Sequence, residues 1–271
     1  MQRYKKPDWP LEGMALSMAK LLQHYKRKDI QEAILENARG REVAISYGKH
    51  RFGKRPDSLS YPNDLLSAVQ AGATSFHLSE EHWSNVQQLS PELSRKQLDQ
   101  IRIGWDLVLD IDCDYFDYSK IATDLLIKAL AHHGVEEVSV KFSGNHGFHI
   151  GVPFKAFPKE VQQHPIQTLF PEGPRRIALY LKDFIRERFS ATLLEHHDVA
   201  TIMKRTGKGF DELVTEGQFD PYKVLTIDTI LLASRHLYRS VYSFNEKSNL
   251  VSIPVDPRKI MAFDREQALP R

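Results

Sequence analysis

The sequence predicts an α/β fold, because segments with the two-residue repeat of strands alternate with segments that have the periodicity of amphipathic helices. The clearest example spans residues 105–153, WDLVLDIDCDYFDYSKIATDLLIKALAHHGVEEVSVKFSGNHGFHIGVP. It reads as a strand, a helix and then two strands joined by a tight turn. Helical stripes at residues 11–39 and 172–189 could cover a sheet. We therefore expect residues 105–153 to form the centre of the fold.

The composition indicates a chain that can bury a full hydrophobic core. Of the 271 residues, 41% are hydrophobic, and the length suits a single domain over residues 1–271. Within it we expect a helical and strand part over about residues 1–104 and a core with the candidate site over about residues 105–256. A formal net charge of +2 permits nucleic-acid binding without requiring it, so the position of the cations matters more than their sum.

Nothing in the sequence predicts a membrane protein or a disulfide-bonded one. No apolar run approaches the ~20 residues that a membrane span requires, and the opening MQRYKKPDWP lacks an apolar signal segment. Cys113 is the single cysteine, which excludes an internal disulfide and a zinc site built from several cysteines. We therefore expect a cytoplasmic protein with no membrane partner.

The first hundred residues predict helices and short strands. Residues 11–39 carry two apolar helical stripes with a break near Lys28, and a strand follows over residues 41–47. A short strand is expected over residues 73–78, and a polar helical region over residues 80–100. These elements would pack against the sheet.

A basic loop, GKHRFGKRP at residues 48–56, allows two interpretations. It is either the solvated tip of a hairpin or a surface that binds template phosphates, with Phe52 available to stack on a base. The sequence favours neither interpretation.

Two carboxylates mark the first strand of the central stretch. Asp110 and Asp112 are two residues apart, so they point to the same face of the strand, about 7 Å apart along the chain. Neighbouring carboxylates repel each other, and a divalent cation between them would offset that cost. The spacing alone fits a strand that ends in an acidic turn equally well, since acidic turns are common.

A helix and a hairpin follow the two carboxylates. Ser119 can cap a helix that ends at Gly134, and a second strand follows over residues 138–142. The turn over residues 143–147 contains two glycines, both expected to be free to adopt positive φ. The returning strand places His149 on the face opposite the core. A lone histidine on a strand is more often structural than catalytic.

A third carboxylate completes the set. The segment KVLTID, residues 223–228, predicts another strand that ends in Asp228. After it comes the strongest basic cluster of the chain, which comprises Arg235, His236, Arg239 and Lys247.

These motifs together resemble the three-motif signature of archaeal–eukaryotic primases, and the closest likeness is to the small catalytic subunit. The matching segments are DID at Asp110–Asp112, SGNHGFHI at Ser143–Ile150, and TID at Asp228 followed by RHLYRSVYSFN. The REVAIS segment at Arg41–Ser46 is similar to an early strand of that family. The signature covers about a third of the chain, in the order of the family.

The resemblance implies a fold and an activity. The fold is a mixed, largely antiparallel sheet flanked by helices and related to the RNA-recognition-motif fold. The activity is primer synthesis from ribonucleoside or deoxynucleoside triphosphates on a single-stranded DNA template. Two Mg²⁺ or Mn²⁺ ions would be held by Asp110, Asp112 and Asp228. A large primase subunit or another replication protein is the implied partner.

The resemblance also implies which residues contact the nucleotide. Arg239 stands where the family has a basic residue beside the triphosphate, and Arg41 stands where an arginine reaches into the active site. The full set of expected nucleotide contacts is Arg41, Ser143, Asn145, His146, His149, His236, Arg239, Asn245 and Lys247.

The chain departs from the family at several positions. Asn245 replaces a usual histidine, while Asn145 and His146 replace two arginines that eukaryotic members often have. These changes imply weaker binding of phosphate, and part of that binding could shift to Lys247. The cysteine-rich zinc knob that members usually insert near the first motif has no counterpart, so we expect no structural zinc.

Three alternatives to a primase remain open on the sequence. The same carboxylates would serve a polymerase that extends an existing primer during repair, or a metal-dependent nuclease that attacks with water. A non-catalytic nucleic-acid-binding module could also keep the fold. The basic cluster argues against a nuclease, and three mutually repelling acids argue against a module without a metal site.

Overall fold

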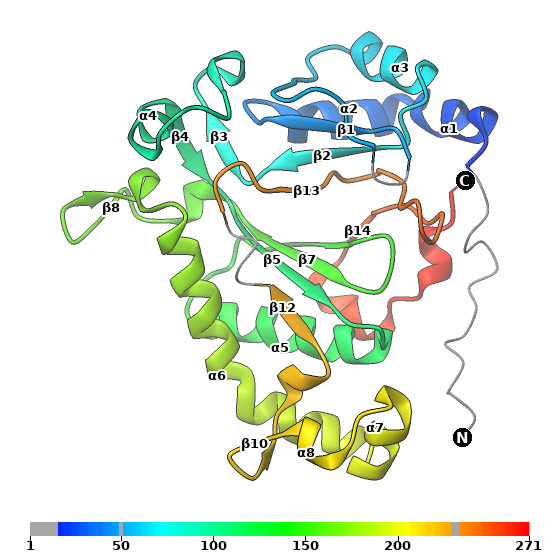
Figure 1. Ribbon diagram of the computed structural model, residues 1–271, viewed down its shortest axis with the longest axis vertical. Helices are drawn as coiled ribbons and strands as arrows, with labels where there is room; N and C mark the ends of the chain where they lie inside the picture. The colour runs from blue at the N-terminus through cyan, green and yellow to red at the C-terminus, as the bar shows by residue number, and fades with distance from the viewer. Residues whose placement is uncertain (1–15, 49–50, 229–232, 271) are drawn as a thin grey trace.

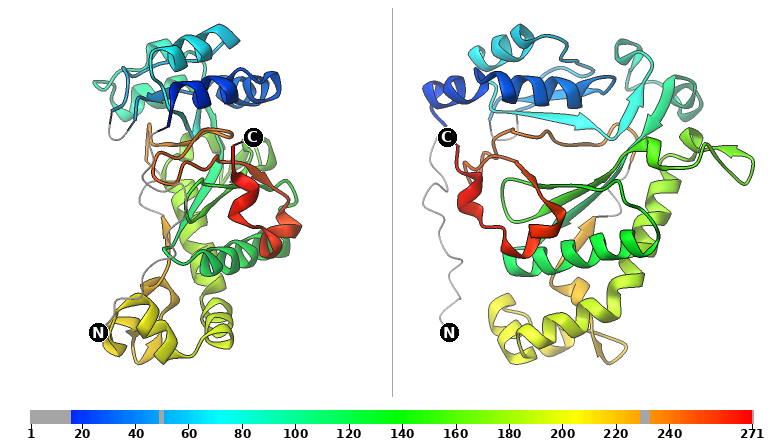
Figure 2. Two further views of the ribbon diagram at one scale, coloured as in Figure 1. Left: turned by 90° about the vertical axis from the view of Figure 1, so that its right-hand side faces the viewer. Right: turned by 180° about the vertical axis from the view of Figure 1, so that it is seen from behind.

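Two antiparallel sheets face each other at the centre of the computed structural model, which describes residues 16–48, 51–228 and 233–270. Figure 1 shows helices α1, α2 and α3 on the outer side of one sheet and α5 on the outer side of the other. The side and rear views show the same order of layers, helix, sheet, sheet and helix (Figure 2). All strand pairs within these two sheets are antiparallel across the described ranges. The expected α/β class with antiparallel sheets is therefore confirmed.

The smaller sheet has the strand order β1-β2-β13 and is covered by the N-terminal helices. Its core contains Leu21, Ile34, Val43, Phe76 and Leu78, all nearly inaccessible to solvent. The two predicted N-terminal helices and the break near Lys28 are present. The elements of this part are α1 (Met18–Tyr25), α2 (Lys28–Ala38), β1 (Val43–Ser46), α3 (Pro62–Gln70) and β2 (Ser75–Ser79).

The third strand of this sheet comes from far along the chain. Strand β13 (Leu237–Arg239) lies beside β2, with Arg239 opposite His77. Phe244 and Val251 then enter the same hydrophobic core. The first hundred residues therefore do not complete their own sheet or core, and the part after Asp228 closes both.

The larger sheet has the order β12-β5-β7-β6-β14. Strand β5 (Leu107–Asp112) lies near its middle because Leu107, Leu109 and Ile111 are fully buried against α5. The other elements of the central stretch are α5 (Phe116–His132), β6 (Ser139–Phe142) and β7 (Phe148–Val152), as the strand–helix–hairpin pattern predicted.

The central helix begins earlier than the expected cap at Ser119. Helix α5 starts at Phe116, whose ring stacks on Phe148 with centroids 5.5 Å apart. Asp117 lies in the first turn, where a negative charge favours a helix N-terminus. Ser119 is buried inside the helix, so tertiary packing of an aromatic residue determines the start, and not the serine.

The region over residues 80–100 is not the helix that was expected. It contains β3 (Glu81–Trp83) and a 3₁₀ turn over Val86–Gln88, and only α4 (Arg95–Ile101) is helical. Strand β3 pairs with β4 (Arg102–Trp105), and a fully buried Arg102–Glu81 ion pair 2.7 Å long joins the two strands. Trp83, Val86, Leu89 and Leu98 form a separate small core, so the apolar residues that suggested a helix do not pack against the main sheet.

The remaining elements extend the larger half of the molecule. Helix α6 (Glu172–His196) is longer than the expected stripe at residues 172–189 and packs along α5. No helix within the described ranges combines enough length and apolarity to cross a membrane. The shorter elements are β8 (Glu160–Val161), β9 (His164–Pro165), α7 (Val199–Thr206), α8 (Phe210–Leu213), β10 (Val214–Thr215), β11 (Gln218–Phe219), β12 (Thr226–Asp228) and β14 (Pro254–Val255), with 3₁₀ turns at Phe154–Ala156, Ile166–Leu169, Pro221–Lys223, Pro257–Ala262 and Arg265–Ala268.

A partly buried acid, Asp106, links the two halves. Asp106 accepts hydrogen bonds from His82 Nε2 at 3.0 Å and from the Phe154 backbone at 2.9 Å, and it pairs with the Arg41 guanidinium. Arg41 Nη1 also donates to the Ser79 carbonyl at 2.8 Å. Burial alone would raise the pKa of Asp106, but these donors outweigh burial and lower the pKa to about 2.

The Asp106→Asn substitution should lower the free energy of unfolding by about 2 kcal/mol at pH 7, because a pKa about two units below normal stabilises the folded state by that amount. The difference from wild type should hold down to about pH 4 and shrink as the pH falls towards 2, where the folded carboxylate takes up its proton. Urea unfolding between pH 7 and pH 3 measures it. Asp124→Asn, which removes a surface pair with Lys128, should cost no more than about 0.5 kcal/mol. Equal losses in the two variants would contradict the expectation.

Candidate active site

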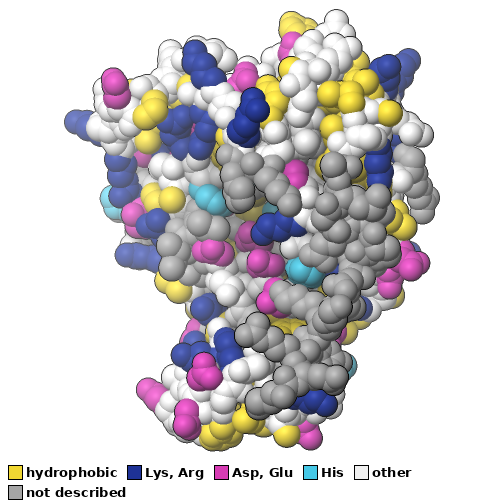
Figure 3. Space-filling model, turned by 45° about the vertical axis from the view of Figure 1, so that its right-hand side comes forward, with side chains coloured by type: hydrophobic (Ala, Val, Ile, Leu, Met, Phe, Trp, Pro, Cys, Tyr) yellow, Lys and Arg dark blue, Asp and Glu magenta, His cyan; other side chains and the backbone are white. Residues whose placement is uncertain are grey.

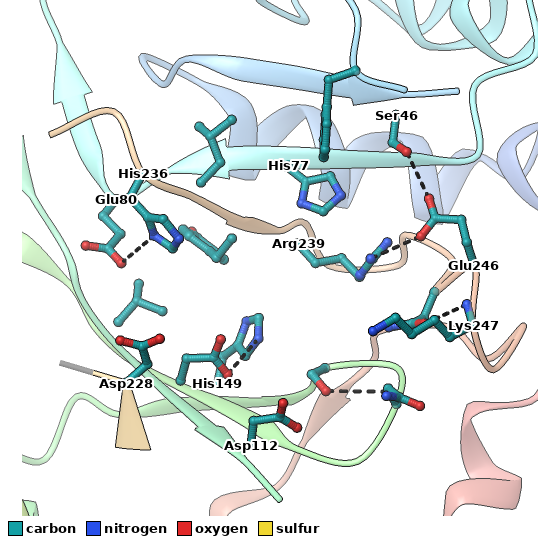
Figure 4. A pocket seen from close by; sticks show the side chains of 18 of the residues that line it. Ser46, His77, Glu80, Asp112, His149, Asp228, His236, Arg239, Glu246 and Lys247 are labelled. Atoms are coloured by element: carbon teal, nitrogen blue, oxygen red, sulfur yellow. Dashed lines mark hydrogen bonds and ion pairs between the residues drawn. The ribbon is translucent and has the colours of Figure 1, made fainter. Parts of the chain in front are cut away.

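A cavity of about 610 Å³ lies between the two sheets. Acidic, basic and histidine side chains gather at the centre of the face onto which it opens (Figure 3). Figure 4 shows that Asp112, His149 and Asp228 come from the larger sheet, while His77 and Arg239 come from the smaller one. The cavity is lined by Ser46, Gly48, Phe52, His77, Glu80, Val108, Asp110, Asp112, Ser143, Asn145, His149, Asp228, residues 236–239, Asn245, Glu246 and Lys247.

Strand register aligns polar and charged side chains in a row across the larger sheet. Asp228 on β12 lies opposite Asp110 on β5, and Asp110 lies opposite His149 on β7. His149 in turn lies opposite Lys141 on β6. His149 Nε2 is 3.5 Å from Asp110 Oδ1. Because residues two apart share a face, Asp112 extends this row at the exposed end of β5.

The carboxylates of this row carry an electrostatic cost. Burial raises the pKa of Asp110, and the neighbouring Asp112 and Asp228 raise it further, to about 6. Lys141 and His236 oppose this effect without cancelling it. A folded protein gains nothing from acids placed so close together, so a cation is the expected compensation.

The residues fit a divalent-cation site in their chemistry, and they lie on one face of one sheet. Carboxylate oxygens are the ligands that Mg²⁺ and Mn²⁺ prefer, and Asp110, Asp112 and Asp228 supply them on one face of one sheet. Within the described ranges, no three His, Cys, Asp or Glu side chains already converge around a common point. The carboxylates would therefore have to turn towards a bound ion.

The opposite wall holds a basic residue in a fixed position. Arg239 Nη2 lies 3.1 Å from Glu246 Oε2, and Glu246 Oε1 accepts hydrogen bonds from the hydroxyls of Ser75, Thr74 and Ser46 at 2.5, 2.8 and 3.1 Å. Burial would raise the pKa of Glu246, but Arg239 and these hydroxyls together lower it to about 2. The Glu246 anion therefore anchors the Arg239 guanidinium at the wall of the cavity.

The glycine turn brings the Ser143 hydroxyl to the edge of the cavity. Ser143 Oγ accepts from the backbone N–H groups of Gly147 and Asn145 at 3.3 and 3.4 Å. Gly144 adopts φ +93°, as expected for the turn. Gly147 does not, which corrects the expectation of positive φ at both glycines. Gly147 is required instead for close approach, because a Cβ there would lie 1.9 Å from the Ile111 carbonyl oxygen.

Most of the expected nucleotide contacts line this cavity, and two do not. Arg41 and His146 are absent from the described lining residues. Arg41 lies instead in an adjoining cavity, where Asp106 holds its guanidinium, so this arrangement gives Arg41 no contact with the site. The expected residues that do line the cavity are Ser143, Asn145, His149, His236, Arg239, Asn245 and Lys247.

Sequence reasoning missed four polar residues at or beside the site. Lys141 could have been found, because the alternation of its strand places it on the same face as Ser143. His77 and Glu246 could not, since their place depends on how β2 and β13 pair. Glu80 is also unexpected, being 3% exposed, with its Oε1 3.8 Å from His236 Nδ1. Burial raises the pKa of Glu80 to about 7.

Comparison with known proteins identifies the fold. No protein-family model and no curated protein matches the sequence. Among solved structures, the polymerase domain from Mycobacterium tuberculosis Ligase D in complex with DNA matches with a TM-score of 0.56. The match covers 99% of this chain and 92% of that one at 14% sequence identity. At this identity the two proteins are shown to share a fold, and their function requires separate argument.

The Gly147→Ala substitution should lower the free energy of unfolding by about 1–3 kcal/mol or more, because the new methyl group would overlap the backbone at Ile111. The same overlap should displace the end of β5 that carries Asp112. Gly209→Ala is the matched control, since Gly209 has φ −71° and a Cβ there would lie 3.6 Å from Glu212 Oε2, an ordinary van der Waals contact. Thermal unfolding of both variants measures the effect, and equal stability would show that the close approach is wrong.

The Asp110→Asn substitution should raise the free energy of unfolding by about 1 kcal/mol at pH 8 without divalent cations. The Asp110 side chain is 37% exposed, so solvent reduces the full cost of its raised pKa. Since the folded pKa is about 6, ionisation destabilises the fold as the pH rises from about 4 to 6, and the gain should vanish below pH 4.

Urea unfolding in EDTA at pH 8 and pH 4 measures this gain. Asp183→Asn, on the surface of α6, should change stability by less than about 0.5 kcal/mol. Added Mn²⁺ should stabilise the wild type and not Asp110→Asn. A variant less stable than the wild type at pH 8 in EDTA would show that the carboxylates do not repel each other.

Proposed function

We propose that this chain is a DNA-templated nucleotidyltransferase that synthesises short RNA or DNA primers on single-stranded DNA, like the small catalytic subunit of a primase. The observation that carries the proposal is the row Asp228–Asp110–His149 on one wall of a cavity whose other wall presents Arg239. Carboxylates that could bind cations thus face an arginine that could bind phosphates. The motif resemblance and the fold shared with a polymerase domain support the same reading.

The incoming nucleotide would bind through its triphosphate. Arg239 and Lys247 supply positive charge, and the Ser143 hydroxyl and the His149 ring supply hydrogen bonds along the same cavity. Asn145 and Asn245 line the cavity as uncharged donors, so they would add weaker contacts.

Asp110, Asp112 and Asp228 would hold two Mg²⁺ or Mn²⁺ ions. When bound, such ions lower the pKa of an attacking 3′-hydroxyl and neutralise charge on the departing pyrophosphate. The chain itself would supply position: the pairing of Asp110 with Asp228 would hold the reacting centre against β5, and Arg239 would orient the phosphates from the opposite wall of the cavity. Positioning and electrostatic stabilisation provide most of the catalysis in phosphoryl transfer, so no covalent intermediate is required.

The template would be held mainly through its backbone, with sequence information coming from base pairing. Phe52 is 54% exposed and lines the cavity, which favours the stacking interpretation of the loop that follows β1. Arg55 of this loop is paired with Glu42, so Arg51 and Lys54 are the better candidates for phosphate contacts.

A second candidate function is the extension of an existing primer. It is favoured by the fold shared with a polymerase domain that was solved in complex with DNA. The same carboxylates and phosphate contacts would serve it, and only the source of the 3′-hydroxyl differs.

A synthesis assay on single-stranded DNA tests both functions. Reactions with and without a primer would contain Mg²⁺ or Mn²⁺ and either ribonucleotides or deoxynucleotides. Asp110→Ala and Asp228→Ala should each reduce product by at least about a hundredfold, since even groups that only support metal ligands are worth 10–100-fold. Asp183→Ala, on the surface of α6, should retain full activity.

The pattern of products separates the candidates. Product without a primer, lost in both aspartate variants, supports primer synthesis, whereas product only with a primer supports extension. If the wild type is inactive with either metal, a partner subunit must be supplied. Continued inactivity would leave a nucleic-acid-binding module, and cleavage of the DNA would indicate a nuclease.

A further inference from the structure

A lysine lies directly behind the histidine of the candidate site. Lys141 Nζ is 2.8 Å from His149 Nδ1, and the two residues are register partners on β6 and β7. His149 is 8% exposed at its side chain and lines both the candidate site and the adjoining cavity, whereas Lys141 lines the adjoining cavity alone. Lys141 therefore contacts the site through the imidazole ring and not directly.

The surrounding hydrogen bonds determine the direction of this contact. The Ser252 hydroxyl donates its single hydrogen to the Phe142 carbonyl at 2.7 Å, so it must accept from Lys141 Nζ at 3.2 Å. An ammonium group has three donors and no acceptor. A second Lys141 N–H thus points to His149 Nδ1, and the cation also lies 5.5 Å from the centroid of the Tyr238 ring.

Because Nδ1 accepts a hydrogen bond from Lys141, the proton of a neutral His149 ring must be on Nε2. Burial lowers the pKa of Lys141 to about 7, and Asp110 opposes this effect. The ammonium form of Lys141 therefore predominates below pH 7.

We propose that Lys141 is a positioning residue that fixes His149 in the Nε2–H tautomer, so that the ring presents a hydrogen-bond donor to a phosphate oxygen of the bound nucleotide. The identity of that phosphate rests on the proposed function, whereas the tautomer does not. Without Lys141, the tautomer depends on the more distant Asp110 carboxylate, 3.5 Å from Nε2, so the Nδ1–H form becomes accessible and would present a lone pair to an anionic oxygen. An attractive contact between Nε2–H and the phosphate oxygen would then become a repulsive contact between a lone pair and that oxygen.

The tautomer is measurable without any enzymatic activity. Long-range ¹H–¹⁵N correlation spectra of protein labelled with ¹⁵N-histidine, taken at about pH 6, distinguish a protonated from an unprotonated ring nitrogen. The chain has 12 histidines, so the His149 signals are assigned by their loss in His149→Ala. The wild type should show an unprotonated Nδ1 and a protonated Nε2. The reverse pattern, or a charged ring, would overturn the proposal even if every Lys141 variant failed to fold.

Three variants test the role of Lys141 itself. In Lys141→Met, which keeps an unbranched side chain but removes the donor, the Nδ1–H tautomer should become populated. Lys141→Gln, whose amide N–H can still donate, should restore the Nε2–H form. Lys128→Met, which removes an exposed lysine from α5, should leave the spectrum unchanged. An unaltered His149 tautomer in Lys141→Met would contradict the inference.

Kinetics provide a second readout. Lys141→Met should raise the KM for the nucleotide about tenfold with little change in kcat, because the loss of one hydrogen bond to a charged group weakens binding by that order. His149→Ala should remove most of the effect of Lys141→Met in the double variant, since one residue acts through the other. Additive losses would show that Lys141 acts independently. If no polymerase activity is found, the proposed function fails, while the spectra still decide the inference.

Discussion

Mutual repulsion among three acids is the constraint around which this structure is arranged. Antiparallel pairing of β12 with β5 places Asp228 opposite Asp110, and Asp112 follows on the same face. The raised pKa of Asp110 expresses the cost of this arrangement. Two groups offset this cost in part: Lys141 on the same sheet, and His236 next to β13 of the opposite sheet. A divalent cation is the partner that would relieve this repulsion, which is why the proposed function places one here.

The cavity exists because two sheets are held facing each other. Asp106 joins Arg41 and His82, while Glu42 pairs with both Arg55 and Arg235, which brings the segment after Asp228 back to the N-terminal sheet. At Asp106 the donors outweigh the cost of desolvation, so this group stabilises the fold. The directional hydrogen bonds of these pairs also restrict how the sheets are aligned. We therefore regard the pairs as determinants of the cavity's geometry as well as of the fold's stability.

The fold shared with a DNA-bound polymerase domain does not by itself assign a reaction, since one fold hosts many functions. The assignment rests on side chains. A nuclease would use the carboxylates and has less need of Arg239 and Lys247 beside them, and a binding module would have no use for Asp110 at a raised pKa. The contact from Lys141 Nζ to His149 Nδ1 places a further cation behind the same wall of the cavity.

Local periodicity was enough to predict β5, α5 and the hairpin, and with them Asp110, Asp112 and the Ser143 turn, because residues that are close in sequence determine these features. Local periodicity failed where contacts between segments far apart in the sequence determine the structure. Strand β3 forms within residues 80–100 because Glu81 pairs with Arg102 on β4, and α5 starts at Phe116 because that ring stacks on Phe148. Only the tertiary structure decided that Asp228 lies opposite Asp110, that Glu246 anchors Arg239, and that Arg41 binds Asp106 outside the site. The register between strands that are far apart in the chain depends on packing and buried charge, which no local pattern encodes.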